Sequence, residues 1–254
     1  MHFSASVLTV ALVGLAQAQT PSGFTPQANT KLEVIYNATM VSTAGQQLAK
    51  ADTAAQPQLA LSSSMTNMSS TYMFVMLDLD VPPANGSTTR RVLLHCMNTG
   101  FKATQQQLNG GVTLLVSPEK GPATYIPPGP PATDTIAHRY VELLFQQPCG
   151  LNVSASGFTD VQQRINFDIT SFMSQNGVSA PLAANFFRVD GRASAGASMA
   201  ATGTGAMPTG TGVMPTGTGA MPTSTLGSFQ GVAGTIDLPY GLAGLLGGLA
   251  AFAM

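Results

Sequence analysis

The side chains that could carry chemistry are few and fall in two short stretches of the chain. Asp78 and Asp80 end an apolar run, and His95 and His138 each lie beside a strand-like segment. Residues two apart on a strand share a face, so Asp78 and Asp80 form a carboxylate pair, which we expect to be exposed at the strand end. By the same spacing, His138 shares a face with Tyr140. Two aspartates and two histidines could ligate a metal ion, or act as acid and base in hydrolysis.

The motifs that would make such chemistry specific are absent from the sequence. There is no H-E-x-x-H pair, no G-x-G-x-x-G, no P-loop and no G-x-S-x-G. These absences argue against zinc proteases, dinucleotide enzymes, P-loop NTPases and nucleophile-elbow hydrolases. Because no nucleophile is evident either, we expect a protein that is not an enzyme, with no catalytic residue, no cofactor and no metal.

The elements that must position these residues are short and β-like. Apolar or alternating runs, separated by clusters of Pro, Gly and Asn, predict strands at 32–36, 72–77, 92–97, 112–116, 140–145 and 185–189. Residues 167–173 are the best helical candidate, with Asp168 as the cap. The glutamine-containing stretch 100–111 predicts a loop. Strands and helices do not alternate, so the pattern predicts a mainly β protein, an antiparallel β-sandwich with a few short helices.

Charge is scarce and confined to one part of the chain. Only 8 % of the 254 residues are charged, 44 % are hydrophobic, and the formal net charge is −1. This composition gives no electrostatic signature for nucleic acid or for an anionic membrane surface. All Asp, Glu, Lys and Arg residues except Asp237 lie between Lys31 and Arg192. We therefore place the globular domain at residues 19–192.

Both ends of the chain carry targeting patterns. Residues 1–18 join an apolar run to Ala16-Gln17-Ala18, which predicts a signal peptide, with a buried N-terminal element as the alternative. Residues 193–235 hold three Thr-, Gly-, Met- and Pro-containing heptads at 202–222. Their glycines and prolines forbid a continuous helix, so we expect a disordered, extended stalk, O-glycosylated or a plain linker.

The last segment, 236–254, is largely apolar and ends the printed sequence. A small-residue site, a short spacer and an apolar tail predict a glycosylphosphatidylinositol (GPI) anchor signal. A retained tail anchor and an ordinary apolar terminus are the alternatives. The candidate attachment residues are Ser224, Gly227, Ser228 and Gly231. Together with the leader, this pattern predicts a secreted protein tethered to the cell surface, at the plasma membrane or cell wall, through a lipid anchor.

Cysteines and glycosylation sequons agree with that route. Cys96 and Cys149 could pair in an oxidising compartment, or remain two buried free thiols. Asn-x-Ser/Thr sequons, typical of a secreted glycoprotein, occur at Asn37, Asn67, Asn85 and Asn152.

Three blocks of the globular segment resemble the phosphatidylethanolamine-binding protein family. Residues 73–95 read MFVMLDLDVPPANGSTTRRVLLH, similar to the family's apolar strand, D-P-D-x-P and histidine. Residues 125–148 read YIPPGPPATDTIAHRYVELLFQQP, similar to its Y-x-G-x-G-P-P and H-R-Y stretch. Residues 165–189 resemble its C-terminal helix and A-N-F-F strand. The blocks occur in family order over about 120 residues, so the resemblance implies the family's β-sandwich.

The resemblance also implies an anion pocket for a phosphate-bearing small molecule or a phospholipid head group. Its residues would be Asp78, His95, Gly129, Pro130, His138 and Tyr140, buttressed by Asp80 and Pro82. Imidazole and phenol groups can donate to a phosphoryl oxygen, and a carboxylate can fix an imidazole tautomer or accept from an ammonium group. Purely structural roles are the alternatives. His95 would then be a core histidine with its hydrogen bonds made inside the protein, and Asp80 would only form a hydrogen bond within its own turn.

Departures from the family pattern concern the rim of the pocket. Leu79 stands where the family usually has Pro, and Pro127 and Pro128 stiffen the loop before Gly129. No Lys or Arg cluster occurs in these blocks, so we expect modest affinity for bare phosphate. Arg139 alternates away from the His138 face and is expected to be structural.

Three functions therefore stay open from the sequence, in descending order of support. The first is a non-catalytic, surface-tethered binder of a phosphorylated head group. The second is an inhibitor or regulator of a secreted or vacuolar protease, such as a serine carboxypeptidase. The third is a structural cell-surface glycoprotein with a vestigial pocket. No nucleic-acid partner is expected.

Overall fold

The computed structural model describes residues 18–193. Apart from Ala18 and Ala193, the predicted signal peptide, stalk and anchor signal lie outside these residues, as do the candidate attachment residues Ser224, Gly227, Ser228 and Gly231. These assignments stay predictions.

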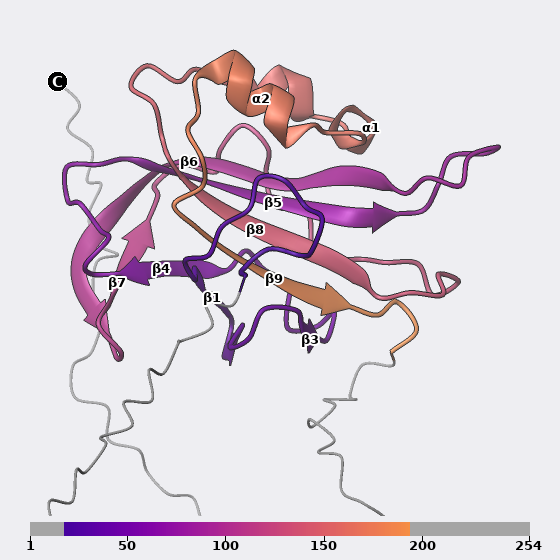
Figure 1. Cartoon of the computed structure of the whole chain (residues 1–254), viewed down its shortest axis with the longest axis horizontal. Helices are drawn as coiled ribbons and strands as arrows, with labels where there is room; N and C mark the ends of the chain where they lie inside the picture. Colours follow the sequence, from indigo (N-terminus) through magenta and orange to yellow (C-terminus); the bar gives the residue numbers. More distant parts are fainter. Residues whose placement is uncertain (1–17, 194–254) are drawn as a thin grey trace, which may run out of the picture. The chain divides into compact units, whose positions relative to one another are not determined.

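One continuous, strongly curled sheet forms the framework of the described residues (Figure 1). Its strand order is β2-β1-β4-β7-β6-β5-β8-β9-β3. The strands are β1 (Glu33–Tyr36), β2 (Thr39–Met40), β3 (Gln46–Leu48), β4 (Gln58–Ser62), β5 (Tyr72–Val81), β6 (Arg91–Leu108), β7 (Val112–Val116), β8 (His138–Gln146) and β9 (Ala183–Val189). Neighbours pair antiparallel except β3 and β9, which are parallel. The mainly β prediction is confirmed.

The long strand β6 folds the sheet into two layers. Its first half pairs with β5, and its second half pairs with β7. Aromatic and aliphatic side chains fill the space inside the curl, among them Tyr36, Phe74 and Phe187. Burial of such side chains is the main force that holds the layers together, because each removes a large apolar area from water.

Short helices cover the outer face of β5, β6 and β8 (Figure 1). They are η1 (Ala155–Phe158), α1 (Val161–Arg164) and α2 (Ile169–Asn176). The Asp168 side chain caps α2, because it accepts from the backbone N–H groups of Thr170 and Ser171 at 2.9 and 3.1 Å. Gly177, with φ of 62°, ends the helix in the left-handed conformation that favours glycine. The predicted helix and its cap are confirmed, with the helix displaced two to three residues along the chain.

The prediction of a loop at 100–111 is wrong for most of its length. β6 continues to Leu108, and its second half pairs with β7 from Lys102–Val116 to Leu108–Val112. Phe101 and Ala103 point into the core while Lys102 is exposed, which is the ordinary alternation of a strand. The three glutamines that suggested a loop lie on the partly exposed end of this strand, where polar side chains cost little.

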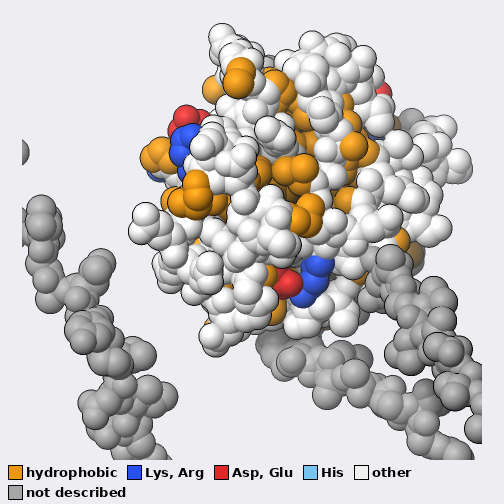
Figure 2. Space-filling view, turned by 60° about the vertical axis from the view of Figure 1, so that its left-hand side comes forward, with side chains coloured by type: hydrophobic (Ala, Val, Ile, Leu, Met, Phe, Trp, Pro, Cys, Tyr) orange, Lys and Arg blue, Asp and Glu red, His pale blue; other side chains and the backbone are white. Residues whose placement is uncertain are grey.

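The surface of the described residues is poor in charge, as the composition predicts. On the face in Figure 2, hydrophobic side chains gather near the middle and charged ones occur in small groups. The four sequon asparagines are exposed, and their glycosylation stays a prediction. Both cysteines are free in the structure, Cys96 buried in β6 and Cys149 exposed, so it shows neither the disulfide nor a pair of buried thiols. Between residues 18 and 193, no helix is long and apolar enough to cross a membrane.

Candidate functional site

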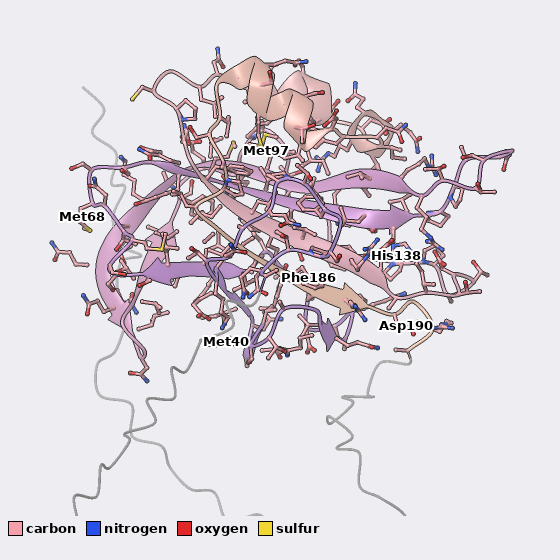
Figure 3. All side chains as sticks on the ribbon, in the orientation of Figure 1. Met40, Met68, Met97, His138, Phe186 and Asp190 are labelled. Carbon is pink, nitrogen blue, oxygen red and sulfur yellow. The ribbon has the colours of Figure 1, made fainter. Side chains whose placement is uncertain are left out.

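Three adjacent strands bring four of the predicted residues together near one end of the sheet. Asp78 on β5 pairs in register with Tyr140 on β8. His138, labelled in Figure 3, lies two residues before Tyr140 at the start of β8. The rings of His138 and Tyr140 are stacked with centroids 6.4 Å apart, so the predicted common face is confirmed. We call Asp78, His95, His138 and Tyr140 the polar cluster.

A β-bulge delivers His95 to this cluster. Met76 on β5 pairs with Cys96, whereas the next residue, Leu77, pairs with Leu94. His95 is therefore the extra residue of β6, and a bulge of this kind re-aims a side chain. Its ring meets that of Tyr140 edge-on, with centroids 5.2 Å apart.

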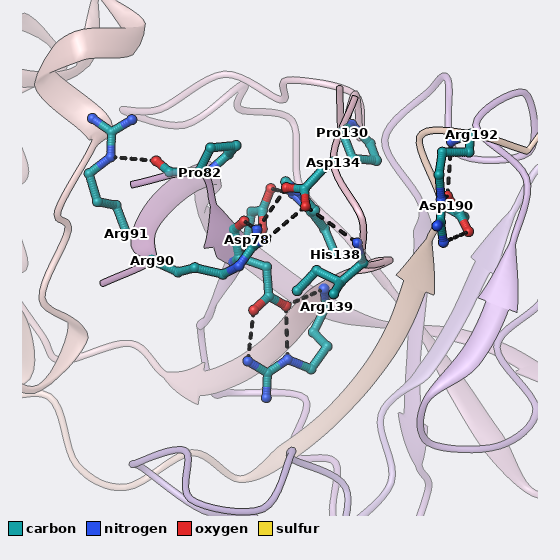
Figure 4. A network of polar contacts seen from close by, with 12 residues as sticks. Asp78, Pro82, Arg90, Arg91, Pro130, Asp134, His138, Arg139, Asp190 and Arg192 are labelled. Carbon is teal, nitrogen blue, oxygen red and sulfur yellow. Dashed lines mark hydrogen bonds and ion pairs between the residues drawn. The ribbon is translucent and has the colours of Figure 1, made fainter. Parts of the chain in front are cut away.

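His138 lies between two buried carboxylates. Its Nδ1 is 2.8 Å from Asp78 Oδ2, and its Nε2 is 2.9 Å from Asp134 Oδ2 (Figure 4). Ionised carboxylates only accept hydrogen bonds, so both ring nitrogens donate and the ring is an imidazolium. Burial alone would lower the pKa of His138, but the hydrogen bonds and charges of Asp78 and Asp134 outweigh it and raise that pKa.

His95 and Tyr140 each bring a buried polar atom that lacks a hydrogen-bond partner, although Asp78 Oδ2 lies 3.8 Å from His95 Nε2. His95 Nδ1 lies 2.7 Å from the Ile126 carbonyl oxygen, to which it must donate. His95 Nε2 and the Tyr140 hydroxyl have no hydrogen-bond partner among the described residues, although both residues are almost fully buried. Burial lowers the pKa of His95. Burial also raises the pKa of Tyr140, and the nearby Asp78 carboxylate adds to that effect.

The expectation of an exposed Asp78–Asp80 pair is wrong. Their exposed fractions are 3 % and 2 %, because each carboxylate has a cationic partner. Asp80 accepts from Arg139 Nε and Nη2, both at 2.8 Å, and from the Arg139 backbone N–H at 2.9 Å. Burial would raise the pKa of Asp80, but these hydrogen bonds outweigh it and lower that pKa. Arg139 thus has a structural role, as expected. Asp80 binds the side chain and backbone of Arg139, and does not only stabilise its own turn.

The sequence reasoning missed Arg90 and Asp134. Arg90 donates from its two terminal nitrogens to the two Asp134 oxygens, each at 2.7 Å, and also to the Asp80 carbonyl. The hydrogen bonds from Arg90 are the main reason that the pKa of Asp134 lies well below its ordinary value. The two residues are 44 positions apart, so no local pattern connects them. Two arginines therefore lie just outside the polar cluster, each already paired with a carboxylate, Arg90 with Asp134 and Arg139 with Asp80.

The remaining predicted residues lie at the edge of the polar cluster. The Pro82 carbonyl accepts from Arg91 Nε at 2.9 Å, and Pro82 also borders a cavity of about 200 Å³ beside Asp134. The Pro130 carbonyl accepts from Lys50 Nζ at 2.9 Å. Gly129 is exposed in the same loop. Within residues 18–193, no group of three or more His, Cys, Asp or Glu side chains is arranged to hold a metal ion.

A separate buried carboxyl lies farther along β8. Glu142 is fully buried, and its Oε1 accepts from the Tyr36 hydroxyl at 2.7 Å. Its Oε2 has no partner among the described residues. Burial raises the pKa of Glu142 to about 8, because a buried carboxylate loses its hydration.

Comparison with known proteins places this geometry in a family context. The family model described as "Phosphatidylethanolamine-binding protein" matches residues 28–187. The "Phomoidride biosynthesis cluster protein N" of Talaromyces stipitatus is 31 % identical over 68 % of this chain and 90 % of its own. The "26 kDa secreted antigen" of Toxocara canis is 28 % identical over 66 % of this chain and 59 % of its own.

Among solved structures, a carboxypeptidase Y inhibitor complexed with its cognate proteinase is similar. It is 21 % identical with a TM-score of 0.49, over 65 % of this chain and 84 % of the inhibitor.

Proposed function

Because the chain belongs to the phosphatidylethanolamine-binding protein family, we propose that it is a binding protein whose polar cluster accepts a phosphoryl group. The ligand is a phosphate-bearing small molecule or a phospholipid head group. The observation that carries the proposal is the pair of buried, unpartnered polar atoms, His95 Nε2 and the Tyr140 hydroxyl. Leaving such atoms unsatisfied costs about 1–3 kcal/mol each, so structures keep them chiefly where a ligand or water completes them.

Charge balance limits how an anion enters this cluster. The carboxylates of Asp78, Asp80 and Asp134 are matched by the cations His138, Arg139 and Arg90. An arriving phosphoryl group brings negative charge that these pairs do not neutralise. Protonation of His95 supplies the missing positive charge and turns Nε2 from an acceptor into a donor.

Binding should therefore strengthen as the pH falls. The pKa of His95 is lowered from its ordinary 6.5 in the free protein, and a bound anion raises it again. Affinity then rises as the pH decreases from 7.5 and levels off below the pKa of the free protein, by at most about tenfold per pH unit for one proton taken up. His138, with its raised pKa, keeps its charge while His95 titrates.

Calorimetric titration of the full chain at pH 5.5, 6.5 and 7.5 tests this function. The probes are phosphoethanolamine, inorganic phosphate and sulfate. Of these, sulfate keeps a constant charge over this pH range, so a change in its affinity reports on the protein. We expect all three to bind, and the sulfate affinity of a His95→Gln variant to vary little with pH. If none of the probes gives a heat of binding, the proposal is contradicted. The next measurement would then be inhibition of a serine carboxypeptidase, which tests the second function left open by the sequence.

We also propose that the chain is exported before it binds its ligand. The predicted leader, the exposed sequon asparagines and the similarity to a secreted antigen support export. Tethering by a lipid anchor rests on the C-terminal sequence alone. Mass spectrometry of the mature protein would reveal both processed ends.

A further inference from the structure

A small surface cavity lies directly outside the polar cluster. It measures about 200 Å³ and is bordered by Pro82, Arg90, Thr133, Asp134 and Thr135. Asp134 is the residue of this border that contacts the cluster, through His138 Nε2. The Asp134 carboxylate therefore both borders the cavity and contacts the imidazolium ring, a contact drawn in Figure 4.

Asp134 makes the contacts that a bound anion would make. Arg90 holds both of its oxygens, each at 2.7 Å, and His138 donates to one of them at 2.9 Å. This two-pronged geometry is the one by which arginine recognises free carboxylates and phosphates. The Asp134 side chain is only 4 % exposed, whereas 27 % of the Arg90 side chain reaches solvent.

The short turn at 131–136 that carries Asp134 is held by few bonds of its own, whereas residues 123–130 of the same connection are tied to the rest of the fold. Asp134 lies between β7 and β8, where its N–H donates to the Pro131 carbonyl at 3.1 Å. The Ile136 N–H donates to Asp134 Oδ1 at 3.3 Å. Both bonds are local, so they can persist when the loop shifts outward. The contacts with Arg90 and His138 are the ones that keep the carboxylate inside.

We propose that Arg90 and His138 form an outer anion subsite. The Asp134 carboxylate fills this subsite in the free protein, and a phosphate or carboxylate group of the ligand displaces Asp134 and takes its place. The proposal rests on the function proposed for the polar cluster, and it adds Arg90 as a ligand-binding residue. Asp134 is then an internal competitor. The Asp134 carboxylate carries one negative charge. A doubly charged phosphate monoester therefore displaces Asp134 more readily than a singly charged phosphodiester does, because the monoester is attracted more strongly to the two cations.

The test uses Asp134→Asn in the full chain, with Asp190→Asn as the matched control. Asp190 is also held by the fork of an arginine, Arg192, but contacts no histidine. Calorimetry at pH 6 would compare inorganic phosphate, phosphoethanolamine as a monoester, and glycerophosphoethanolamine as the diester of a lipid head group. We expect the Asp134→Asn variant to bind all three probes about tenfold more tightly than the wild type does. The ligand then no longer has to replace a charge-assisted hydrogen bond of the Asp134 carboxylate, and one such bond corresponds to about that factor. The control should match the wild type, and the monoester should bind more tightly than the diester.

A second variant keeps the proposal testable if Asp134→Asn does not fold. Arg90→Gln removes the fork and should weaken phosphate binding at least tenfold, because the ligand loses a charged donor. Unchanged or tighter binding in Arg90→Gln, or an unchanged affinity in folded Asp134→Asn, would show that the pair only fastens the loop. Failure of the wild type and both variants to bind any probe would overturn the proposed function as well.

Discussion

Replacing His138 by alanine should destabilise the fold by about 3–5 kcal/mol at pH 6 and abolish phosphate binding, because it leaves buried carboxylates without their shared cation. Asp78 loses its 2.8 Å partner, and Asp134 keeps Arg90 as its one cationic partner among the described residues. The matched control is His95→Ala, which removes an equally buried imidazole but only one hydrogen bond, to a neutral carbonyl. Urea unfolding of both variants at pH 6 measures the difference.

The pH dependence of that loss has a definite sign. The folded-state pKa of His138 is raised above the ordinary 6.5. Its contribution to stability is therefore complete below pH 6.5 and is lost as the pH rises through the folded pKa. The gap between the wild type and His138→Ala should narrow accordingly at alkaline pH. Equal losses in His138→Ala and His95→Ala would contradict the paired-carboxylate account of the polar cluster.

Glu142 should make the protein less stable as the solution becomes alkaline. Its pKa is raised from an ordinary 4.5 to about 8, so the folded chain holds a proton that the unfolded chain has lost. A raised folded-state pKa gives stability that is present below pH 4.5 and is lost as the pH rises through about 8. A shift of this size corresponds to about 5 kcal/mol, and Glu142 is fully buried, so bulk solvent does not screen it.

The variant that isolates this effect is Glu142→Gln, which keeps an oxygen to accept from the Tyr36 hydroxyl and never ionises. Urea unfolding at pH 5, 7 and 9 should show stability close to that of the wild type at pH 5, and an advantage for the variant that is already large at pH 7 and levels off above pH 8. Glu33→Gln, a substitution near the surface, should keep the wild-type slope. Parallel stability curves for the wild type and Glu142→Gln would show that the pKa of Glu142 is not raised in the folded state, which would contradict this prediction.

The framework of the fold could be predicted because it follows from local patterns. Alternating or apolar runs located six of the strands, and Asp168 marked the start of α2 through its capping chemistry. The continuation of β6 past Gly100 could not be predicted in this way. Gln107 and the residues on either side of the glutamine run pair with β7, and only that pairing separates an exposed strand from a polar loop. The short strands β2, β3 and β4 were missed.

The position of a site residue could be predicted where residue spacing along a strand determines it. It could not be predicted where contacts between distant parts of the chain determine it. His138 and Tyr140 share a face because strands have a period of two. The position of His95 depends on a bulge, which shifts that period by one residue. The burial of Asp80 depends on Arg139 from another strand, and Asp134 meets Arg90 across 44 residues. Pairings between distant residues leave no trace in a single sequence.

The central claim is that the Tyr140 hydroxyl is kept unpartnered in order to bind a ligand, and Tyr140→Phe tests it most directly. The substitution removes only that oxygen, which has no hydrogen-bond partner among residues 18–193. Phosphoethanolamine titration at pH 5.5 should show affinity reduced about tenfold or more, the value of one hydrogen bond to a charged group. Thermal unfolding without ligand should show stability equal to or above that of the wild type. Unchanged affinity in this variant would contradict the account.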